Sequence, residues 1–260
     1  MLSGRRLTIY VPEVRPDLKV RPSTSADGAP GLQARGPANL LILHDGQNLF
    51  DPARAYVPGQ TWQVADTADR LIAAGDMPPT VIVGIDHAGD RRLREFGHGA
   101  AAYARFVVRD VLPYVRHQYD VRRDPAGTAM GGSSMGGLVT LQIATLRPDV
   151  FGSLLVFSPS VWWHRRSILR AIRRPGVFTR LFSHGHGIRD DVQVWLSIGL
   201  QEGEQAIGDA RRLRDVLLDM RGGDASKLRY VEDPDGTHSE TSWAKQLGEA
   251  LCAAPPTRSA

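Results

Sequence analysis

The stretch GGSSMGG, residues 131–137, places two adjacent serines and a methionine between two pairs of glycines. A short β-type run at residues 127–130 precedes it, and an apolar helical pattern follows it over residues 135–146. The stretch is therefore expected to join a strand to a helix by a tight turn, the connection that recurs along a parallel α/β sheet.

Within this stretch, Gly132, Ser134 and Gly136 match the pattern G-x-S-x-G, in which the serine stands on a sharp strand-to-helix turn. Bulky residues two positions to either side would collide with the turn, so glycines are expected there. If Ser133 were the central serine, Met135 would occupy a position that needs a small residue. The spacing therefore predicts Ser134 as a nucleophile and Ser133 as its neighbour.

Two other interpretations of the glycine-rich run are disfavoured. A phosphate-binding loop is disfavoured because no lysine follows the glycines, as the P-loop pattern requires. A flexible linker is disfavoured because Met130, Met135 and Leu138 are poor residues for a solvated tether.

Short β-type runs alternate with helical patterns along the chain. The β-type runs lie at residues 7–12, 40–44, 80–86, 154–157, 192–199 and 228–232. The helical patterns lie at residues 61–74, 101–119, 135–146, 205–220 and 239–253. Because the strands are almost continuously apolar, helices are expected to cover both faces of the sheet. The chain is thus predicted to be an α/β protein of the α/β-hydrolase fold, with a mostly parallel central sheet flanked by helices on both faces.

No change of composition interrupts this alternation, so residues 1–260 are predicted to form a single domain. The segment 21–37, rich in Pro, Ser and Gly, is expected to be a long hairpin loop after the first strand. The segment 174–191 is expected to be a second, irregular insertion.

Composition excludes several classes of protein. The chain has 260 residues, 42% of them hydrophobic and 23% charged, which is ordinary for a globular protein. The net charge of +4 is dispersed, and the densest basic run, residues 165–174, is predicted to be a solvated helix face, so no nucleic-acid partner is expected. A single cysteine, Cys252, excludes an internal disulfide framework. No apolar stretch is long enough for a membrane span or a secretory signal, so a cytoplasmic protein is expected.

A base and an acid that could assist Ser134 follow later strands. The run ending at Gly199 is followed by Glu202, and the next run leads to His238. This order of serine, acid and histidine is the one that α/β-hydrolases use. His238 is predicted to take the proton from Ser134, and Glu202 to orient the imidazole.

Other candidates for these roles stay open. The rival acids are Glu204, Asp233 and Asp235. His184 and His186 are a two-ligand fragment without an obvious third ligand, so no metal is expected. The remaining histidines are expected to be surface or structural residues: His87, His98, His117 and His164.

Acyl transfer also requires donors aimed at the developing oxyanion. The amide of Met135, directly after the nucleophile, is predicted to be one of them. The amide of Gln47, in the loop after residues 40–44, is predicted to be the other, with Gly46 allowing the backbone to approach the substrate.

Several motifs together resemble the putative esterase family, which groups esterase D, enterochelin esterases, feruloyl esterases and the mycolyltransferases. They are LHDGQNLFD (43–51), VIVGID (81–86), RRLREF (91–96), GGSSMGGL (131–138), FGSLLVFSPSVWW (151–163), GLQEGE (199–204) and GTHSETSW (236–243). The resemblance implies Ser134 as nucleophile, His238 as base, Glu202 as acid and Gln47 as an oxyanion donor.

Two departures from the family affect the expected substrate. Mycolyltransferases follow the D-G pair with a hydrophobic residue and an arginine, but here Gln47 and Asn48 follow, so their sugar recognition is not expected. Enterochelin esterases usually carry an added N-terminal domain, whereas this chain starts at the catalytic sheet. A siderophore substrate is therefore not favoured by the sequence.

Three residues are assigned to the substrate pocket: Asp45, Trp162 and Trp163. The two tryptophans follow the strand after the nucleophile helix, where they could wall the pocket or pack in the core. Similarly, Arg91, Arg94 and Glu95 could bind a polar substrate group or form a structural ion pair, and the ion pair is favoured.

The sequence therefore predicts a serine esterase that needs no metal or organic cofactor and acts on a small-molecule ester. An acyltransferase, in which an alcohol or sugar replaces water, is the alternative within enzymes. A catalytically silent binding protein on the same fold is a minor one. A homo-oligomer is compatible with the sequence.

Overall fold

The computed structural model describes residues 4–12, 36–173 and 187–253. Within these ranges seven strands form one sheet in the order β1-β3-β2-β4-β5-β6-β7. The strands are β1 (Leu7–Tyr10), β2 (Asn39–His44), β3 (Thr80–Ile85), β4 (Thr128–Ser133), β5 (Ser153–Phe157), β6 (Gln193–Gly199) and β7 (Leu228–Asp233). All neighbouring strands are parallel except β1, which is antiparallel to β3. The predicted α/β fold with a mostly parallel sheet is confirmed.

The first strand corrects one prediction. Leu7 of β1 lies opposite Ile85 of β3, so β1 pairs with β3 and not with the strand that follows it in sequence. The segment 21–37 is therefore not the loop of a hairpin, and residues 13–35 lie outside the described residues.

Eight α-helices lie in the described part of the chain: α1 (Val64–Ala74), α2 (Arg92–Phe96), α3 (Ala100–Phe106), α4 (Leu112–Gln118), α5 (Met135–Leu146), α6 (Trp163–Ile172), α7 (Glu204–Asp219) and α8 (Glu240–Ala253). The predicted helix 101–119 is interrupted by a π-helical turn at Val107–Val111, between α3 and α4. Pro113 follows this turn and has no N–H to donate, which explains why the regular hydrogen-bond pattern changes there.

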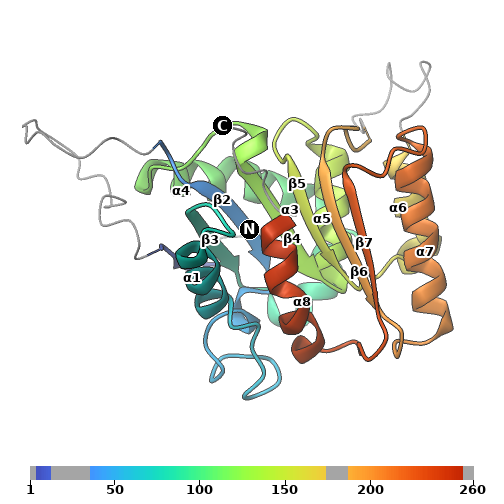
Figure 1. Ribbon diagram of the computed structural model, residues 1–260, viewed down its shortest axis with the longest axis horizontal. Helices are drawn as coiled ribbons and strands as arrows, with labels where there is room; N and C mark the ends of the chain where they lie inside the picture. The colour runs from blue at the N-terminus through green and yellow to red at the C-terminus, as the bar shows by residue number, and fades with distance from the viewer. Residues whose placement is uncertain (1–3, 13–35, 174–186, 254–260) are drawn as a thin grey trace, which may run out of the picture.

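The sheet separates two apolar clusters, and alternate residues of β2 face each of them. Leu41 and Leu43 pack in one cluster with α1 and α8. Leu40 and Ile42 pack in the other with residues of α3, α4, α5, α6 and α7. Figure 1 shows α1 and α8 on one side of the sheet and α3, α5, α6 and α7 on the other. Helices therefore cover both faces, as predicted.

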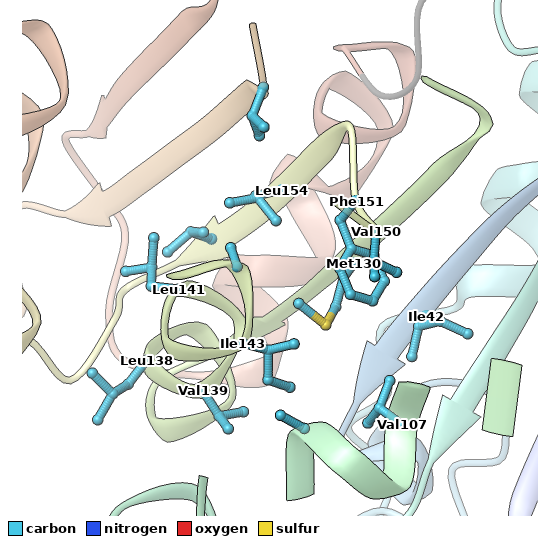
Figure 2. Close-up of a cluster of buried hydrophobic side chains, with 14 of the residues drawn as sticks. Ile42, Val107, Met130, Leu138, Val139, Leu141, Ile143, Val150, Phe151 and Leu154 are labelled. Atoms are coloured by element: carbon cyan, nitrogen blue, oxygen red, sulfur yellow. The ribbon is translucent and has the colours of Figure 1, made fainter. Parts of the chain in front are cut away.

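Helix α5 is embedded in the second cluster. Figure 2 shows Ile143 of this helix beside Met130 of β4, and Leu138, Val139 and Leu141 on other sides of the same helix. Nearly all of α5 is buried, and this rigid packing holds the turn that precedes it. No helix in the described part of the chain is long and apolar enough to cross a bilayer.

Candidate active site

The turn between β4 and α5 has the strained geometry expected of a nucleophile's turn. Ser134 has φ 57° and ψ −121°, which side chains rarely adopt, and its N–H donates to Phe157 O at 2.9 Å. A Cβ on Gly132 would lie 3.1 Å from the backbone of Gly136, tighter than ordinary contacts. Gly132 is therefore needed because the chain approaches itself, and a Cβ on Gly136 would lie 3.0 Å from Asp45 Oδ2. Ser133 is buried at the end of β4.

The structure brings Ser134, His238 and Glu202 together from the carboxyl ends of three strands. Ser134 Oγ lies 2.9 Å from His238 Nε2, and His238 Nδ1 lies 2.6 Å from Glu202 Oε2. A proton on Nδ1 directed at the carboxylate leaves Nε2 free to accept a hydrogen bond from the serine. Such an arrangement can supply a nucleophile, a base and an acid that orients the base.

The side chain of Glu202 is only 2% exposed, and its two carboxylate oxygens have different hydrogen-bond partners. Oε1 accepts hydrogen bonds from Gly199 N–H at 2.9 Å and from Ser158 Oγ at 2.5 Å. Ser158 in turn accepts a hydrogen bond from Trp243 Nε1 at 2.9 Å, and the Trp243 ring lies edge-on to His238 with centroids 5.0 Å apart. Gly199, Ser158 and Trp243 therefore position the side chains of Glu202 and His238.

The rival acids do not reach the histidine. Glu204 is exposed at the start of α7. Asp233 accepts a hydrogen bond from Asp235 N–H at 3.1 Å, and Asp235 is itself exposed. Of these four carboxylates, Glu202 is the one in hydrogen-bond contact with His238.

The predicted oxyanion loop, residues 45–48, follows β2 as a short 3₁₀ turn. Gln47 lies in this turn, and Met135 begins α5, where helix amides lack intrahelical acceptors. A Cβ on Gly46 would lie 2.6 Å from Gly84 C of β3. The close approach to strand β3 is therefore one reason for the glycine, and its predicted role in admitting the substrate stays a prediction.

Asp45, which we expected in the substrate pocket, lies in a buried ion pair. Its side chain is 6% exposed, and its two oxygens accept from Arg92 Nε and Nη2, each at 2.7 Å. Asp45 itself has a left-handed backbone, φ 58°. Glu95 likewise pairs with Arg5 at 2.7 Å, so the favoured ion pair is found for Glu95, with a partner outside the run, whereas Arg91 and Arg94 are exposed. Arg92 thus also forms a structural ion pair, although the sequence analysis did not single it out.

A second carboxylate, Glu240, lies near the site at the start of α8. Its Oε1 accepts from Asn48 Nδ2 at 2.8 Å, and its Oε2 accepts from Trp62 Nε1. Burial raises the pKa of Glu240 to about 7, an increase that Trp62 opposes by hydrogen bonding and Asp45 reinforces by its charge.

Aromatic rings follow Ser160, whose Oγ lies 3.4 Å from Ser134 Oγ. Trp162 is 46% exposed and its ring lies 5.6 Å from that of Trp163. Trp163 is half-buried and packs edge-on to His98, with centroids 5.3 Å apart. The two tryptophans therefore differ: Trp162 faces solvent, and Trp163 is largely packed.

The chain just beyond these rings is strained. His164, Arg165 and Arg166 all have left-handed backbone angles, with φ between 47° and 59°. Arg166 Nε donates at 2.5 Å to Asp209, which is almost completely buried. This ion pair ties the strained turn to α7, so the predicted solvated face of the run 165–174 is solvated only in part.

No group of three or more His, Cys, Asp or Glu side chains that could hold a metal occurs in the described ranges. His184 and His186 lie outside those ranges. His44, which sequence reasoning did not single out, is fully buried beside Tyr103, and burial lowers its pKa to about 4.

Sequence reasoning missed the residues that support the three central side chains. Ser158 and Trp243 lie inside two of the quoted motifs, SPSVWW and HSETSW, and polar residues there were a usable signal. Arg92 and Glu240 also lie inside quoted motifs, RRLREF and HSETSW, but the motifs do not reveal their partners, which are distant in sequence.

A model of the family described as Putative esterase matches residues 29–254. The siderophore enterobactin esterase of Emericella nidulans is 37% identical over 220 residues, covering 78% of this chain and 70% of the relative. The iron(III) salmochelin esterase of Escherichia coli is 29% identical over 154 residues, covering 58% of this chain and 34% of the relative.

Solved structures share the fold. The enterobactin esterase of Shigella flexneri, solved in the presence of enterobactin, aligns with a TM-score of 0.69 at 21% identity, over 95% of this chain and 54% of that one. A ferulic acid esterase aligns with a TM-score of 0.63 at 16% identity, over 96% of this chain and 92% of that one. The chain thus spans about a third of the salmochelin esterase and about half of the Shigella esterase.

Proposed function

Because this chain belongs to the Putative esterase family, as its motifs predicted, we propose that it hydrolyses carboxylic esters through an acyl-enzyme on Ser134. The observation that carries the proposal is the continuous hydrogen-bonded series from Ser134 through His238 to Glu202, with distances of 2.9 and 2.6 Å. Such a series is the arrangement that activates a serine hydroxyl.

In the first half-reaction Ser134 Oγ attacks the ester carbonyl carbon while its proton passes to His238 Nε2. The negative oxygen of the tetrahedral intermediate accepts hydrogen bonds from the amides of Met135 and Gln47. The intermediate then collapses, the C–O bond to the alcohol breaks, and the alcohol leaves with the proton from His238.

In the second half-reaction water attacks the acyl group while His238 removes its proton. The second tetrahedral intermediate releases the carboxylic acid and returns the proton to Ser134. Glu202 accepts the hydrogen bond from His238 Nδ1 in both steps and stabilises the imidazolium that forms. Its burial and its two further hydrogen-bond donors, Gly199 and Ser158, support this role because they hold the carboxylate in one orientation.

We infer that the substrate is an ester with an aromatic group, of the kind found in catechol siderophores. The relatives named for siderophores include the Emericella nidulans enterobactin esterase, and the Shigella flexneri enterobactin esterase was also solved in the presence of 2,3-di-hydroxy-N-benzoyl-serine. The exposed ring of Trp162, close in sequence to Ser160, supports this inference because aromatic groups stack on such rings. The expectation against a siderophore rested on where the chain begins, and the similarity to siderophore esterases outweighs it.

The test is hydrolysis of enterobactin and of p-nitrophenyl esters of graded acyl length, with products identified by mass spectrometry. We expect turnover by the wild-type chain, loss of it in Ser134→Ala, and retention in Ser133→Ala. The opposite pattern in the two variants would refute the assignment. Added alcohol acceptors that outcompete water would indicate an acyltransferase. If the chain bound the esters but neither hydrolysed them nor reacted covalently with a fluorophosphonate, it would be a binding protein.

A further inference from the structure

Glu240, the partly buried carboxylate at the start of α8, has no role in the steps above. We propose that Glu240 is a positioning residue: it joins the loop that carries His238 to the oxyanion loop (residues 45–48) and thereby holds the Gln47 amide in place. The proposal rests on the proposed function, in which that amide stabilises the oxyanion. Glu240 is only two residues after His238, yet its contacts, Asn48 and Trp62, lie in the segment after β2.

The oxyanion loop is held at both ends by charged side chains. At its start, Asp45 accepts two hydrogen bonds from Arg92, both at 2.7 Å. At its end, Asn48 donates to Glu240 at 2.8 Å. Asn48 Oδ1 accepts from Tyr56 N–H at 2.9 Å, so its amide group is oriented with Nδ2 toward Glu240. Gln47 lies between the two held residues.

The first turn of α8 connects this loop to the histidine and the acid. Trp243, three residues after Glu240, packs edge-on against His238. Its indole N–H donates to Ser158, which donates in turn to Glu202. Residues three apart share one face of a helix. One helical turn therefore contacts the oxyanion loop through Glu240 and the acid's partner through Trp243, so a shift of α8 would disturb both halves of the site.

The chemistry of the contact favours a carboxylate over any neutral group. Both hydrogen-bond partners of Glu240, Asn48 Nδ2 and Trp62 Nε1, are donors. A carboxylate accepts from both. A glutamine turns an N–H donor toward one of them, and a protonated acid accepts more weakly because one oxygen carries a proton.

The charged groups that face Glu240 are Asp45 from the oxyanion loop and Arg92 from α2. Burial, followed by the charge of Asp45, raises the pKa of Glu240 to about 7, while the hydrogen bonds and Arg92 oppose the increase. The charged contact should therefore be half formed near pH 7, become complete about one pH unit higher, and weaken at lower pH.

The first test is kinetic. Glu240→Gln is compared with wild type and with Glu249→Gln, an exposed glutamate on the same helix, using p-nitrophenyl acetate from pH 5.5 to 9. Active sites are titrated with a fluorophosphonate so that misfolded protein is not counted. An oxyanion donor acts in the transition state, so we expect Glu240→Gln to lower kcat about 10- to 100-fold at pH 8 with KM within about threefold. The deficit should shrink below pH 7, where wild type also loses the charge. Glu249→Gln should behave as wild type.

A kcat within about twofold of wild type at pH 8, a deficit independent of pH, or a change in KM alone would overturn the proposal. A second measurement needs no turnover. The Trp62 indole N–H resonance, assigned with Trp62→Phe, should titrate with a midpoint near pH 7 in wild type and in Ser134→Ala, and not in Glu240→Gln. Absence of that titration overturns the role of Glu240 whatever the activity, whereas absence of ester hydrolysis in wild type overturns the proposed function.

Discussion

The hydroxyl of Ser158 donates a hydrogen bond to Glu202 Oε1 at 2.5 Å. This contact, together with Gly199 N–H, occupies one oxygen of the carboxylate and leaves Oε2 to His238. The orientation of Glu202 therefore depends on a serine from a different strand-end loop, which itself accepts a hydrogen bond from Trp243 of α8.

Glu202→Gln should lower kcat by about 10²- to 10⁴-fold, because a glutamine no longer stabilises the imidazolium and favours the wrong tautomer. Glu204→Gln, which changes an exposed carboxylate two residues away, should stay near wild type. Steady-state kinetics on a p-nitrophenyl ester measures both. A nearly active Glu202→Gln would mean that another carboxylate is the acid.

Ser158→Ala should lower kcat about tenfold with little change in KM, because the acid loses a donor and the Trp243 indole loses its acceptor. Trp243→Phe keeps a ring beside His238 and leaves Ser158 in place, so its effect should be smaller. If Ser158→Ala matched wild type in kcat, the orientation of Glu202 would not depend on this contact.

Arg92→Gln should destabilise the chain by about 2–4 kcal/mol in urea unfolding, since it leaves the buried Asp45 carboxylate unpaired. Arg94→Gln, at an exposed position on the same short helix, should change the free energy of unfolding by less than about 0.5 kcal/mol. Equal effects of the two substitutions would show that the ion pair with Asp45 contributes no stability.

His44 should make the stability of the fold dependent on acid pH. Its pKa is about 4 in the folded chain, against 6.5 when unperturbed, because burial disfavours the charged form. A depressed pKa contributes stability above pH 6.5 that is lost as pH falls through 4. The loss attributable to His44 between pH 7 and pH 5 is about 2 kcal/mol.

This loss is measured as the difference between wild type and His44→Asn, which keeps a polar atom near Tyr103 and does not titrate. The difference is needed because Glu240 acts with the opposite sign: its pKa is raised, so its contribution grows as pH falls from 7. Parallel pH dependence of the two proteins would contradict the assignment to His44.

The two tryptophans after Ser160 should respond differently to substitution. Trp162→Ala should raise KM for aryl esters about 2- to 10-fold and leave short alkyl esters unchanged, because an exposed ring offers stacking. Trp163→Ala should lower the free energy of unfolding by about 2–4 kcal/mol, because its ring packs against Gly97 and His98. If Trp163→Ala raised KM and Trp162→Ala lowered the free energy of unfolding, Trp163 would be the pocket residue and Trp162 the core residue.

Much of the fold could be predicted because its signals are local. The apolar runs and helical periods predict most strands and helices to within a few residues, and the glycine spacing around Ser134 reflects sterics over five residues. The short helix α2, the π turn and the pairing of β1 with β3 were missed. The pairing of β1 with β3 depends on which distant segment lies alongside, and a local pattern does not carry that information. The π turn has a local cause in Pro113, which the helical period alone does not reveal.

The sequence by itself determined the α/β class, the sharp turn at Ser134 and the order of serine, acid and histidine, since these follow from backbone sterics and from the edge at which parallel strands end. Only the tertiary structure decided which of four carboxylates reaches His238, that Asp45 is neutralised by Arg92, and that Glu240 contacts Asn48 across the site. Those contacts act over a few ångströms between residues far apart in the chain, so they exist only once the strand ends have been brought together.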